Sequence, residues 1–195
     1  MSDGRKETPL VDETSLNRMI TRISHEIVEK VGTLENLVLI GIWTRGVYLA
    51  KRIADTISRV ASVEMPVGSL DISFYRDDVY GKVDQPVVKS TDISFDVNEK
   101  TVVIIDDVLF TGRTVRAAMD AVMDYGRPRR IMLAVLIDRG HRELPIRADI
   151  VGKNVPTRAD EMVRVHLKEI DGKDETILYT PFPEQGKDAG DVGTK

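Results

Sequence analysis

The most informative segment of this chain reads Val102-Val103-Ile104-Ile105-Asp106-Asp107-Val108-Leu109-Phe110-Thr111-Gly112-Arg113-Thr114. Its first four residues are short, apolar and β-branched, which is typical of a strand covered on both faces in a parallel sheet. A helix is predicted directly after the segment, because apolar residues recur there at helical spacing, at Val115, Ala118, Met119, Val122 and Met123. The segment therefore predicts a buried strand, a tight turn and a helix.

The turn from Thr111 to Thr114 is suited to binding an anion. It lies where the N–H groups of a starting helix are unpaired and the helix dipole favours negative charge, and Gly112 lets a ligand approach the backbone. Asp106 and Asp107 can accept hydrogen bonds from sugar hydroxyls and hold a divalent cation through water. We expect the chain to curl past the strand end, so that both acids flank a ribose at different heights. The alternative is an acid pair that only ends a strand and caps a helix.

The composition indicates one ordinary domain. The chain has 195 residues, of which 42% are hydrophobic and 31% charged, which is enough apolar material for a core. It contains no cysteine, so disulfides, thiolate metal sites and a cysteine nucleophile are excluded. The longest apolar stretches are strand-sized, and residues 1–8 lack the layout of a signal peptide. We expect a cytoplasmic protein without a membrane partner.

The charge distribution restricts any nucleic-acid partner to one face. The net charge is −4, which gives no general attraction to a polyanion, and no DNA partner is expected. Residues 127–168 contain ten Lys or Arg and five acids, a local net charge of +5. A polyanion could bind only at a defined surface there, and scattered solvated charges are the alternative.

Helical and strand patterns alternate along the chain. Helices are predicted over residues 16–31, ending at Gly32, and over 47–57. Strands are predicted near residues 37–42, 67–75, 86–93, 101–105 and 131–137, with a weaker pair at 163–167 and 176–179. This order predicts an α/β fold with an open, largely parallel sheet and a ligand site beyond the carboxyl ends of its strands. We expect a flexible N-terminus over 1–11, a single domain over 12–181 and a disordered tail over 182–195.

Residues 102–114 resemble the phosphoribosyl pyrophosphate (PRPP) signature of the type I phosphoribosyltransferases. Residues 41–46, 70–78, 135–149 and 151–157 resemble one subfamily, the bifunctional pyrimidine operon regulators with uracil phosphoribosyltransferase activity. The similarity extends from about Leu16 to Tyr179, and its last two segments are the most specific. It implies the type I phosphoribosyltransferase fold, a mostly parallel twisted sheet flanked by helices, with a small hood and a flexible lid hairpin.

The resemblance implies a PRPP site made of two loops and a lid. Mg²⁺ would accompany PRPP and be held indirectly by Asp106 and Asp107, which would be catalytic together with Arg76 of the lid. A non-proline cis peptide is implied near Thr44, and Trp43 departs from the lysine frequent in relatives. Taken alone, the first loop could be a helix start with a glycine for steric relief, and the lid a charged hairpin tip. The PRPP-binding set comprises Thr44, Arg45, Gly46, Asp106, Asp107, Val108, Leu109, Phe110, Thr111, Gly112, Arg113 and Thr114.

The resemblance also implies a uracil site and an RNA surface. Uracil would be recognised mainly by the main chain of Ile137, Asp138, Arg139 and Gly140, for which a structural turn is the alternative. The RNA surface would bind a leader messenger RNA hairpin of pyrimidine genes more tightly with UMP or UTP bound. For the residues on the first predicted helix, Thr21, Arg22 and His25, the alternative is a solvated helix face without RNA. The implied RNA-binding residues are Thr21, Arg22, His25, His141, Arg142, Arg147, Lys153 and Thr157.

The expected protein is thus a transcription attenuation regulator that also converts uracil and PRPP to UMP and pyrophosphate, assembled as a homodimer or a larger even-numbered oligomer. Two rivals stay open: a salvage phosphoribosyltransferase without RNA binding, and an RNA regulator with negligible catalysis. A P-loop NTPase is excluded, because the sequence contains no Gly-x-x-x-x-Gly-Lys-Ser/Thr segment.

Overall fold

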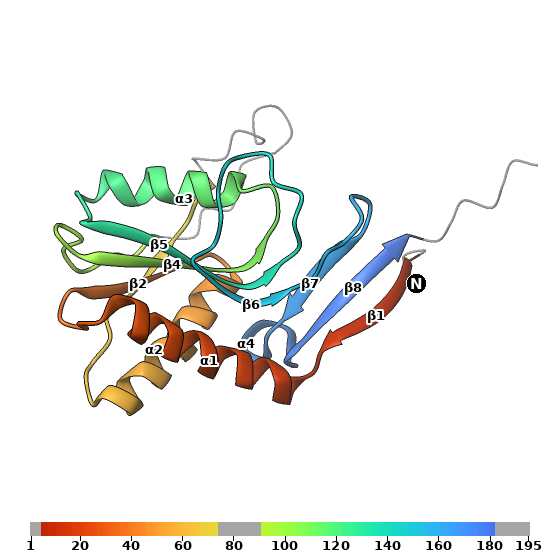
Figure 1. Cartoon of the computed structure of the whole chain (residues 1–195), viewed down its shortest axis with the longest axis horizontal. Helices are drawn as coiled ribbons and strands as arrows, with labels where there is room; N and C mark the ends of the chain where they lie inside the picture. Colours follow the sequence, from red (N-terminus) through yellow and green to blue (C-terminus); the bar gives the residue numbers. More distant parts are fainter. Residues whose placement is uncertain (1–4, 74–90, 182–195) are drawn as a thin grey trace, which may run out of the picture.

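The computed structural model describes residues 5–73 and 91–181 (Figure 1). In chain order the elements are β1 (Arg5–Val11), α1 (Glu13–Val31), β2 (Leu37–Ile42), α2 (Arg45–Ala61), β3 (Val67–Leu70), β4 (Thr101–Leu109), α3 (Arg113–Asp124), β5 (Arg130–Asp138), β6 (Ile150–Asn154), β7 (Met162–His166), α4 (Lys168–Asp171) and β8 (Glu175–Pro181). No helix in these two ranges combines the length and apolar character needed to cross a membrane.

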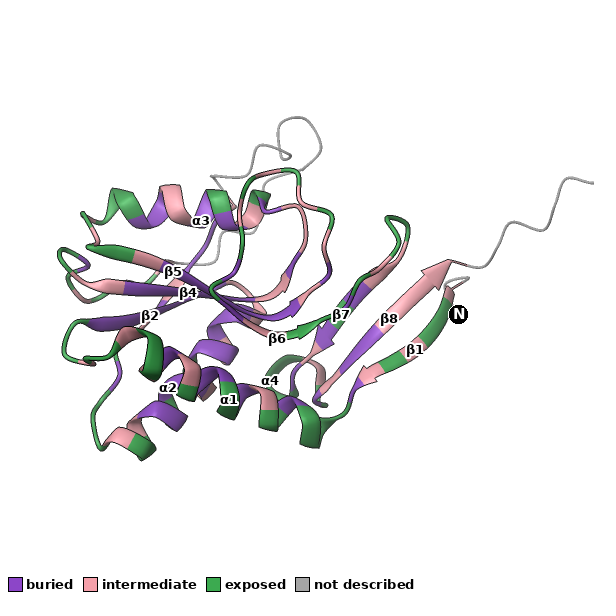
Figure 2. Ribbon diagram, in the orientation of Figure 1, coloured by how far each residue is buried: buried purple, intermediate pink, exposed green. Residues whose placement is uncertain are grey.

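The main sheet is parallel and covered on both faces. Its strand order is β3-β2-β4-β5-β6, with α1 and α2 on one face and α3 on the other (Figure 1). Side chains of β4 alternate between the two cores: Val103 and Ile105 pack toward α1 and α2, and Val102 and Ile104 toward α3. Figure 2 shows the resulting buried centre of the sheet. The predicted α/β fold with a parallel sheet is confirmed.

A second sheet of three antiparallel strands, in the order β1-β8-β7, forms the hood beside the main sheet (Figure 1). The expectation that residues 1–11 are loose was wrong for residues 5–11, which form β1. Backbone hydrogen bonding to β8 orders them, Val11 is buried, and the Lys153 ammonium donates to the carbonyl of Leu10 at 2.9 Å. These partners lie far away in the sequence, so a polar segment carries little local sign of them.

The sequence patterns located most strands but not all of their limits. No strand was predicted at β6, which pairs with β5 at the edge of the main sheet. The strand predicted over 67–75 ends at Leu70. The strand predicted over 86–93 lies largely outside the described residues, and Asp92 forms a single bridge with Ser69. Residues 182–195 are also outside the described part.

Two glycines let the start of α2 lie directly against the main sheet. A Cβ atom on Gly46 would lie 2.3 Å from the carbonyl oxygen of Ile105, and one on Gly41 would lie 2.4 Å from the carbonyl oxygen of Gly46. Real Cβ atoms do not approach backbone so closely, so any larger residue would push the helix away. The absence of side chains at both positions therefore places Arg45 beside the carboxyl ends of β2 and β4.

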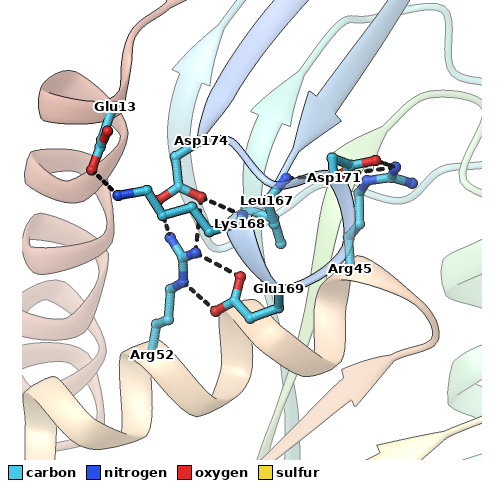
Figure 3. A network of polar contacts seen from close by, with 8 residues as sticks. All are labelled: Glu13, Arg45, Arg52, Leu167, Lys168, Glu169, Asp171 and Asp174. Carbon is cyan, nitrogen blue, oxygen red and sulfur yellow. Dashed lines mark hydrogen bonds and ion pairs between the residues drawn. The ribbon is translucent and has the colours of Figure 1, made fainter.

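An ionic network fastens the hood to α2 (Figure 3). The Arg52 guanidinium donates to Glu169 at 2.8 Å and to Asp174 at 2.9 Å, which raises the pKa of Arg52. Asp174 also accepts the N–H of Lys168 at 2.8 Å, and the Lys168 ammonium pairs with Glu13 of α1. The network joins α1, α2 and the segment between β7 and β8.

We predict that Gly46→Ala lowers the free energy of unfolding by about 2 kcal/mol or more, because the added methyl group overpacks a backbone contact. Urea denaturation measures the change. Gly172→Ala is the control: it strains a residue at φ 73° but meets no atom within 4 Å. Its loss should be about 1 kcal/mol. Equal losses for both variants would contradict the close contact at Gly46.

We predict that the Asp174→Asn variant loses about 2 kcal/mol of stability near pH 7, because its charged hydrogen bonds disappear. Burial alone raises the pKa of Asp174, but hydrogen bonds from Arg52 and Lys168 outweigh burial and hold this pKa below 3.8. Such a contribution is present above the unfolded-state pKa and is lost as the pH falls through the folded-state pKa. Urea denaturation between pH 7 and pH 2 should therefore show the variant and the parent converging in acid.

Asp160→Asn is the control for this experiment, because the Asp160–Arg158 ion pair is exposed to solvent on both sides. It should change stability far less. A constant difference between the parent and Asp174→Asn at all pH values would contradict an ionic role.

Candidate active site

Both acids of the central segment lie within β4, which continues to Leu109. The expectation that the chain curls away before them was wrong, because Asp106 still pairs with Val135 of β5. Successive strand residues point to opposite faces, so the two carboxyl groups are not equivalent. Asp106 is 7% exposed, and its Oδ1 accepts the N–H of Asp107 at 2.9 Å. Asp107 is half-buried and is the more accessible acid.

The electrostatic setting of Asp107 ties it to Arg45. Burial raises the pKa of the Asp107 carboxyl group above its ordinary value, while the interaction with Asp106 and the positive charge of Arg45 act in the opposite direction. The neighbouring Gly46 lies against Ile105 and Asp106, so the loop that carries Arg45 borders both acids. The site places one cation beside two carboxylates at the end of the sheet.

The predicted phosphate turn has the expected form. Gly112 adopts a left-handed conformation with φ 93° immediately before α3, which begins at Arg113. The turn surrounds a hollow of about 340 Å³ that is lined by residues 108–115 and by Glu143. The carbonyl of Thr111 accepts the N–H groups of Glu143 and Leu144 at 3.0 and 3.2 Å, so the β5–β6 connection supports the turn. Arg113 pairs with Glu143 at 2.7 Å at its rim.

The loop before α2 lies at the next strand end. A cis peptide joins Trp43 and Thr44, as the resemblance implied, and α2 starts at Arg45. The Arg45 Nη2 donates to both carboxylate oxygens of Asp171 in α4, at 2.9 and 3.1 Å. Asp171 was missed in the sequence, because 126 residues separate it from Arg45 and no local pattern signals the contact. The ring of Trp43 packs edge-on against Tyr48, with ring centroids 6.3 Å apart.

In the turn predicted to bind uracil, several main-chain groups already hydrogen-bond within the chain. The N–H of Arg139 donates to Leu109 at 3.1 Å, and that of Gly140 to the Asp138 side chain at 3.0 Å. The carbonyl of Asp138 accepts the N–H of Val155 at 2.8 Å. The N–H groups of Arg139 and Gly140 are therefore already used. A base bound here would donate to the second lone pair of a carbonyl oxygen, such as that of Asp138, or accept from other N–H groups.

The side chain of Arg139 connects the base turn with the phosphate turn. Its guanidinium lies over the Phe110 ring, 4.0 Å from the centroid, and donates to Thr157 at 3.1 Å. The imidazole of His141 shares a 2.6 Å hydrogen bond with the carbonyl of Thr157 and meets Phe110 edge-on. Phe110, Arg139, His141 and Thr157 therefore form one contact group that links residues predicted for PRPP, uracil and RNA.

The remaining residues predicted for RNA lie on α1, on β6 and on the connection between β5 and β6. Thr21, Arg22 and His25 line an open hollow of about 580 Å³ along α1. Arg22 donates to the carbonyls of Val151 and Gly152 and so joins α1 to β6, where Lys153 follows. The structure brings these four residues together at one edge of the main sheet.

Arg142 and Arg147 differ in how many of their hydrogen-bond donors are free to contact RNA. The Arg142 guanidinium donates to the carbonyls of Phe110 at 2.7 Å and Ile146 at 3.0 Å and pairs with Asp138. Its donors thus hold the site together. Arg147 is exposed, and no hydrogen bond or ion pair joins it to another described residue. Arg76 lies outside the described residues.

A comparison with family models matches residues 10–169 to the phosphoribosyl transferase domain. Solved hypoxanthine phosphoribosyltransferases have the same fold. The enzyme of Trypanosoma cruzi superposes with a TM-score of 0.68 at 18% identity over 89% of this chain and 97% of its own. The enzyme of Staphylococcus aureus has a TM-score of 0.66 at 22% identity over 93% and 96%. Fold and site define a phosphoribosyltransferase.

Three close relatives belong to one family of phosphoribosyltransferases. "Bifunctional protein PyrR" of Ligilactobacillus salivarius is 56% identical over 85% of this chain and 94% of its own length. The protein of the same name from Clostridioides difficile is 56% identical over 89% and 98%, and that from Bacillus mycoides is 52% identical over 90% and 98%. The chain belongs to the PyrR family of phosphoribosyltransferases.

We predict that Asp107→Asn lowers the turnover of UMP formation at least about tenfold, because a carboxylate beside the ribose stabilises the positive charge that develops there. The assay uses saturating uracil and PRPP. Asp120→Asn is the control, since Asp120 pairs with Arg116 on the surface of α3. Unchanged turnover in Asp107→Asn would remove Asp107 from the mechanism.

Proposed function

We propose that this chain is a uracil phosphoribosyltransferase that also regulates pyrimidine genes by binding leader messenger RNA. One observation carries the catalytic part: Asp106 and Asp107 lie in the last part of β4, which runs to Leu109 and is followed by the left-handed turn at Gly112 and by α3. The carboxylates proposed to bind the ribose thus precede, in one continuous segment, the turn proposed to bind its 5′-phosphate. Membership of the PyrR family supports the pairing of the two activities.

The reaction requires no covalent nucleophile. N1 of uracil attacks the anomeric carbon of PRPP, the C–O bond to pyrophosphate breaks, and the N1 proton leaves. Positive charge builds on the ribose, where Asp107 stabilises it, and negative charge builds on pyrophosphate, which the loop at Thr44, Arg45 and Gly46 binds. The turn from Thr111 to Thr114 holds the 5′-phosphate through its N–H groups. The resemblance adds Arg76, which lies outside the described residues, to the phosphate-binding groups.

The donor set fits magnesium that arrives with PRPP. Within residues 5–73 and 91–181 no group of three or more His, Cys, Asp or Glu side chains is placed to hold a metal. Asp106 and Asp107 offer carboxylate oxygens, which Mg²⁺ prefers, and they suit contact through water while PRPP supplies the remaining oxygens. Mg²⁺ would neutralise charge on the leaving pyrophosphate.

The RNA surface combines the edge formed by α1 and β6 with the neighbouring connection between β5 and β6. Thr21, Arg22, His25 and Lys153 occupy the first part, and the exposed Arg147 belongs to the second. UMP or UTP would tighten RNA binding through the contacts that join Phe110, Arg139, Thr157 and His141. A homodimer or a larger even-numbered oligomer would extend this surface. Because its proposed partner is a leader messenger RNA, the protein is proposed to act in the cytoplasm.

A salvage enzyme without RNA binding is the second candidate. It is favoured by the internal contacts of Arg22, Arg142, Lys153 and Thr157, whose donors already serve backbone oxygens of the chain. This candidate keeps the nucleotide site and predicts no specific RNA affinity.

The activity test is direct. Purified protein is incubated with labelled uracil, PRPP and Mg²⁺, and UMP is separated and counted. We expect UMP formation that depends on both PRPP and Mg²⁺. Failure to form UMP, together with retained RNA binding, would favour a regulator without useful catalysis.

We predict that Arg147→Gln weakens binding of a pyrimidine-gene leader hairpin at least about fivefold and reduces the dependence of affinity on salt, because a phosphate contact is lost. Filter binding with and without UMP measures both. Arg116→Gln removes a cation that already pairs with Asp120 on α3; it is the control and should bind like the parent. Equal affinity of Arg147→Gln and the parent would mean that this surface does not bind RNA.

A further inference from the structure

Asp171, in the hood, is the fixed partner of the arginine in the pyrophosphate loop. Its Oδ2 accepts the N–H of Leu167 at 2.9 Å, and its own N–H donates to the carbonyl of Leu167 at 2.7 Å. The carboxylate therefore has little freedom to follow another group. Both of its oxygens accept from Nη2 of Arg45, and Figure 3 shows the two side chains meeting between α2 and α4.

The turn that carries Asp171 is itself anchored to α2. Arg52 lies two helical turns after Arg45 and binds Glu169 and Asp174 on either side of Asp171 in the sequence. The hood and the pyrophosphate loop are thus connected twice, once through Arg52 and once through Arg45. The contacts of Arg52 fix the backbone of α4. The contact with Asp171 then fixes the side chain of Arg45, which belongs to the candidate site.

The pair leaves part of the Arg45 guanidinium unused. Asp171 engages Nη2, whereas Nε of Arg45 is buried and has no hydrogen-bond partner among the residues described. A buried N–H without a partner costs free energy and is satisfied when a ligand supplies an acceptor. The oxygens of pyrophosphate are such acceptors, and the loop of Arg45 lies beside Asp107 at the end of the sheet.

We propose that Asp171 is a positioning residue that holds the Arg45 guanidinium by one edge so that its remaining N–H groups face the pyrophosphate of PRPP. The inference rests on the proposed function and adds a hood residue that sets the affinity for the leaving group. An unpaired arginine would lose side-chain entropy on every binding event, and Asp171 removes that cost beforehand. Asp171 itself touches neither substrate nor reacting atoms.

The test is binding of magnesium pyrophosphate to the full chain. Trp43 is the single tryptophan and precedes Thr44 and Arg45, so its fluorescence reports on this loop, and calorimetry provides a second readout. We expect Asp171→Asn to raise the Kd for magnesium pyrophosphate about fivefold, because the charged contact that orders Arg45 is lost. Asp171→Glu retains a carboxylate and should recover part of the affinity.

Kinetics separate positioning from a general loss of structure. In Asp171→Asn the KM for PRPP should rise about fivefold, while kcat and the KM for uracil stay within twofold of the parent. Asp160→Asn is the matched control: it makes the same acid-to-amide change in an exposed ion pair with Arg158, outside α4, and should leave the Kd unchanged. In the double variant with Arg45→Gln, which removes the cation, the effect of Asp171→Asn should vanish.

The outcomes are distinguishable. A parent protein that does not bind magnesium pyrophosphate would contradict the proposed function and this inference together. A parent that binds it while Asp171→Asn binds equally well would overturn the inference alone. Additive effects of the Arg45 and Asp171 substitutions would also overturn it.

Discussion

The start of α2 lies against the main sheet through a contact in which no side chain takes part. The backbone of Gly46 approaches Ile105 so closely that a Cβ atom would come within 2.3 Å of its carbonyl oxygen, and Gly41 accommodates the same helix from β2. This contact brings the loop of Arg45 beside the acids of β4. Without it, the loop proposed to bind pyrophosphate would lie away from the acids proposed to bind ribose, and one PRPP molecule could not contact both.

The site depends equally on contacts between segments that are distant in sequence. Arg142 ties the phosphate turn at Phe110 to the base turn at Asp138, and Arg139 stacks on Phe110 while it binds Thr157. These contacts use guanidinium groups as structural links, since each can donate to several oxygens at once. A displacement of one of these loops therefore displaces the others. Such a chain of contacts is what a nucleotide site and an RNA site need in order to influence one another.

Local patterns were reliable where burial is strong and regular. The apolar stripe of α1 with its stop at Gly32, the buried strand from Leu37 to Ile42 and the turn at Gly112 were all predicted and found. The patterns were unreliable where strands are short or exposed, as in β1 and β6. Pairing with β5, which extends to Leu109, also carries β4 past the acids, although the polar residues suggested an earlier end.

The sequence by itself determined the alternation of strands and helices, the acid pair, the glycine turn and the resemblance to phosphoribosyltransferases, because these reside in contiguous residues with a defined period or order. Only the tertiary structure decided that residues 5–11 complete the hood sheet, that Asp171 holds Arg45, and that several basic side chains predicted to contact RNA also bind the chain itself. Such contacts join residues as far apart in the sequence as Arg5 and Pro181. Their energies depend on distance in space, and no local pattern of residues encodes that distance.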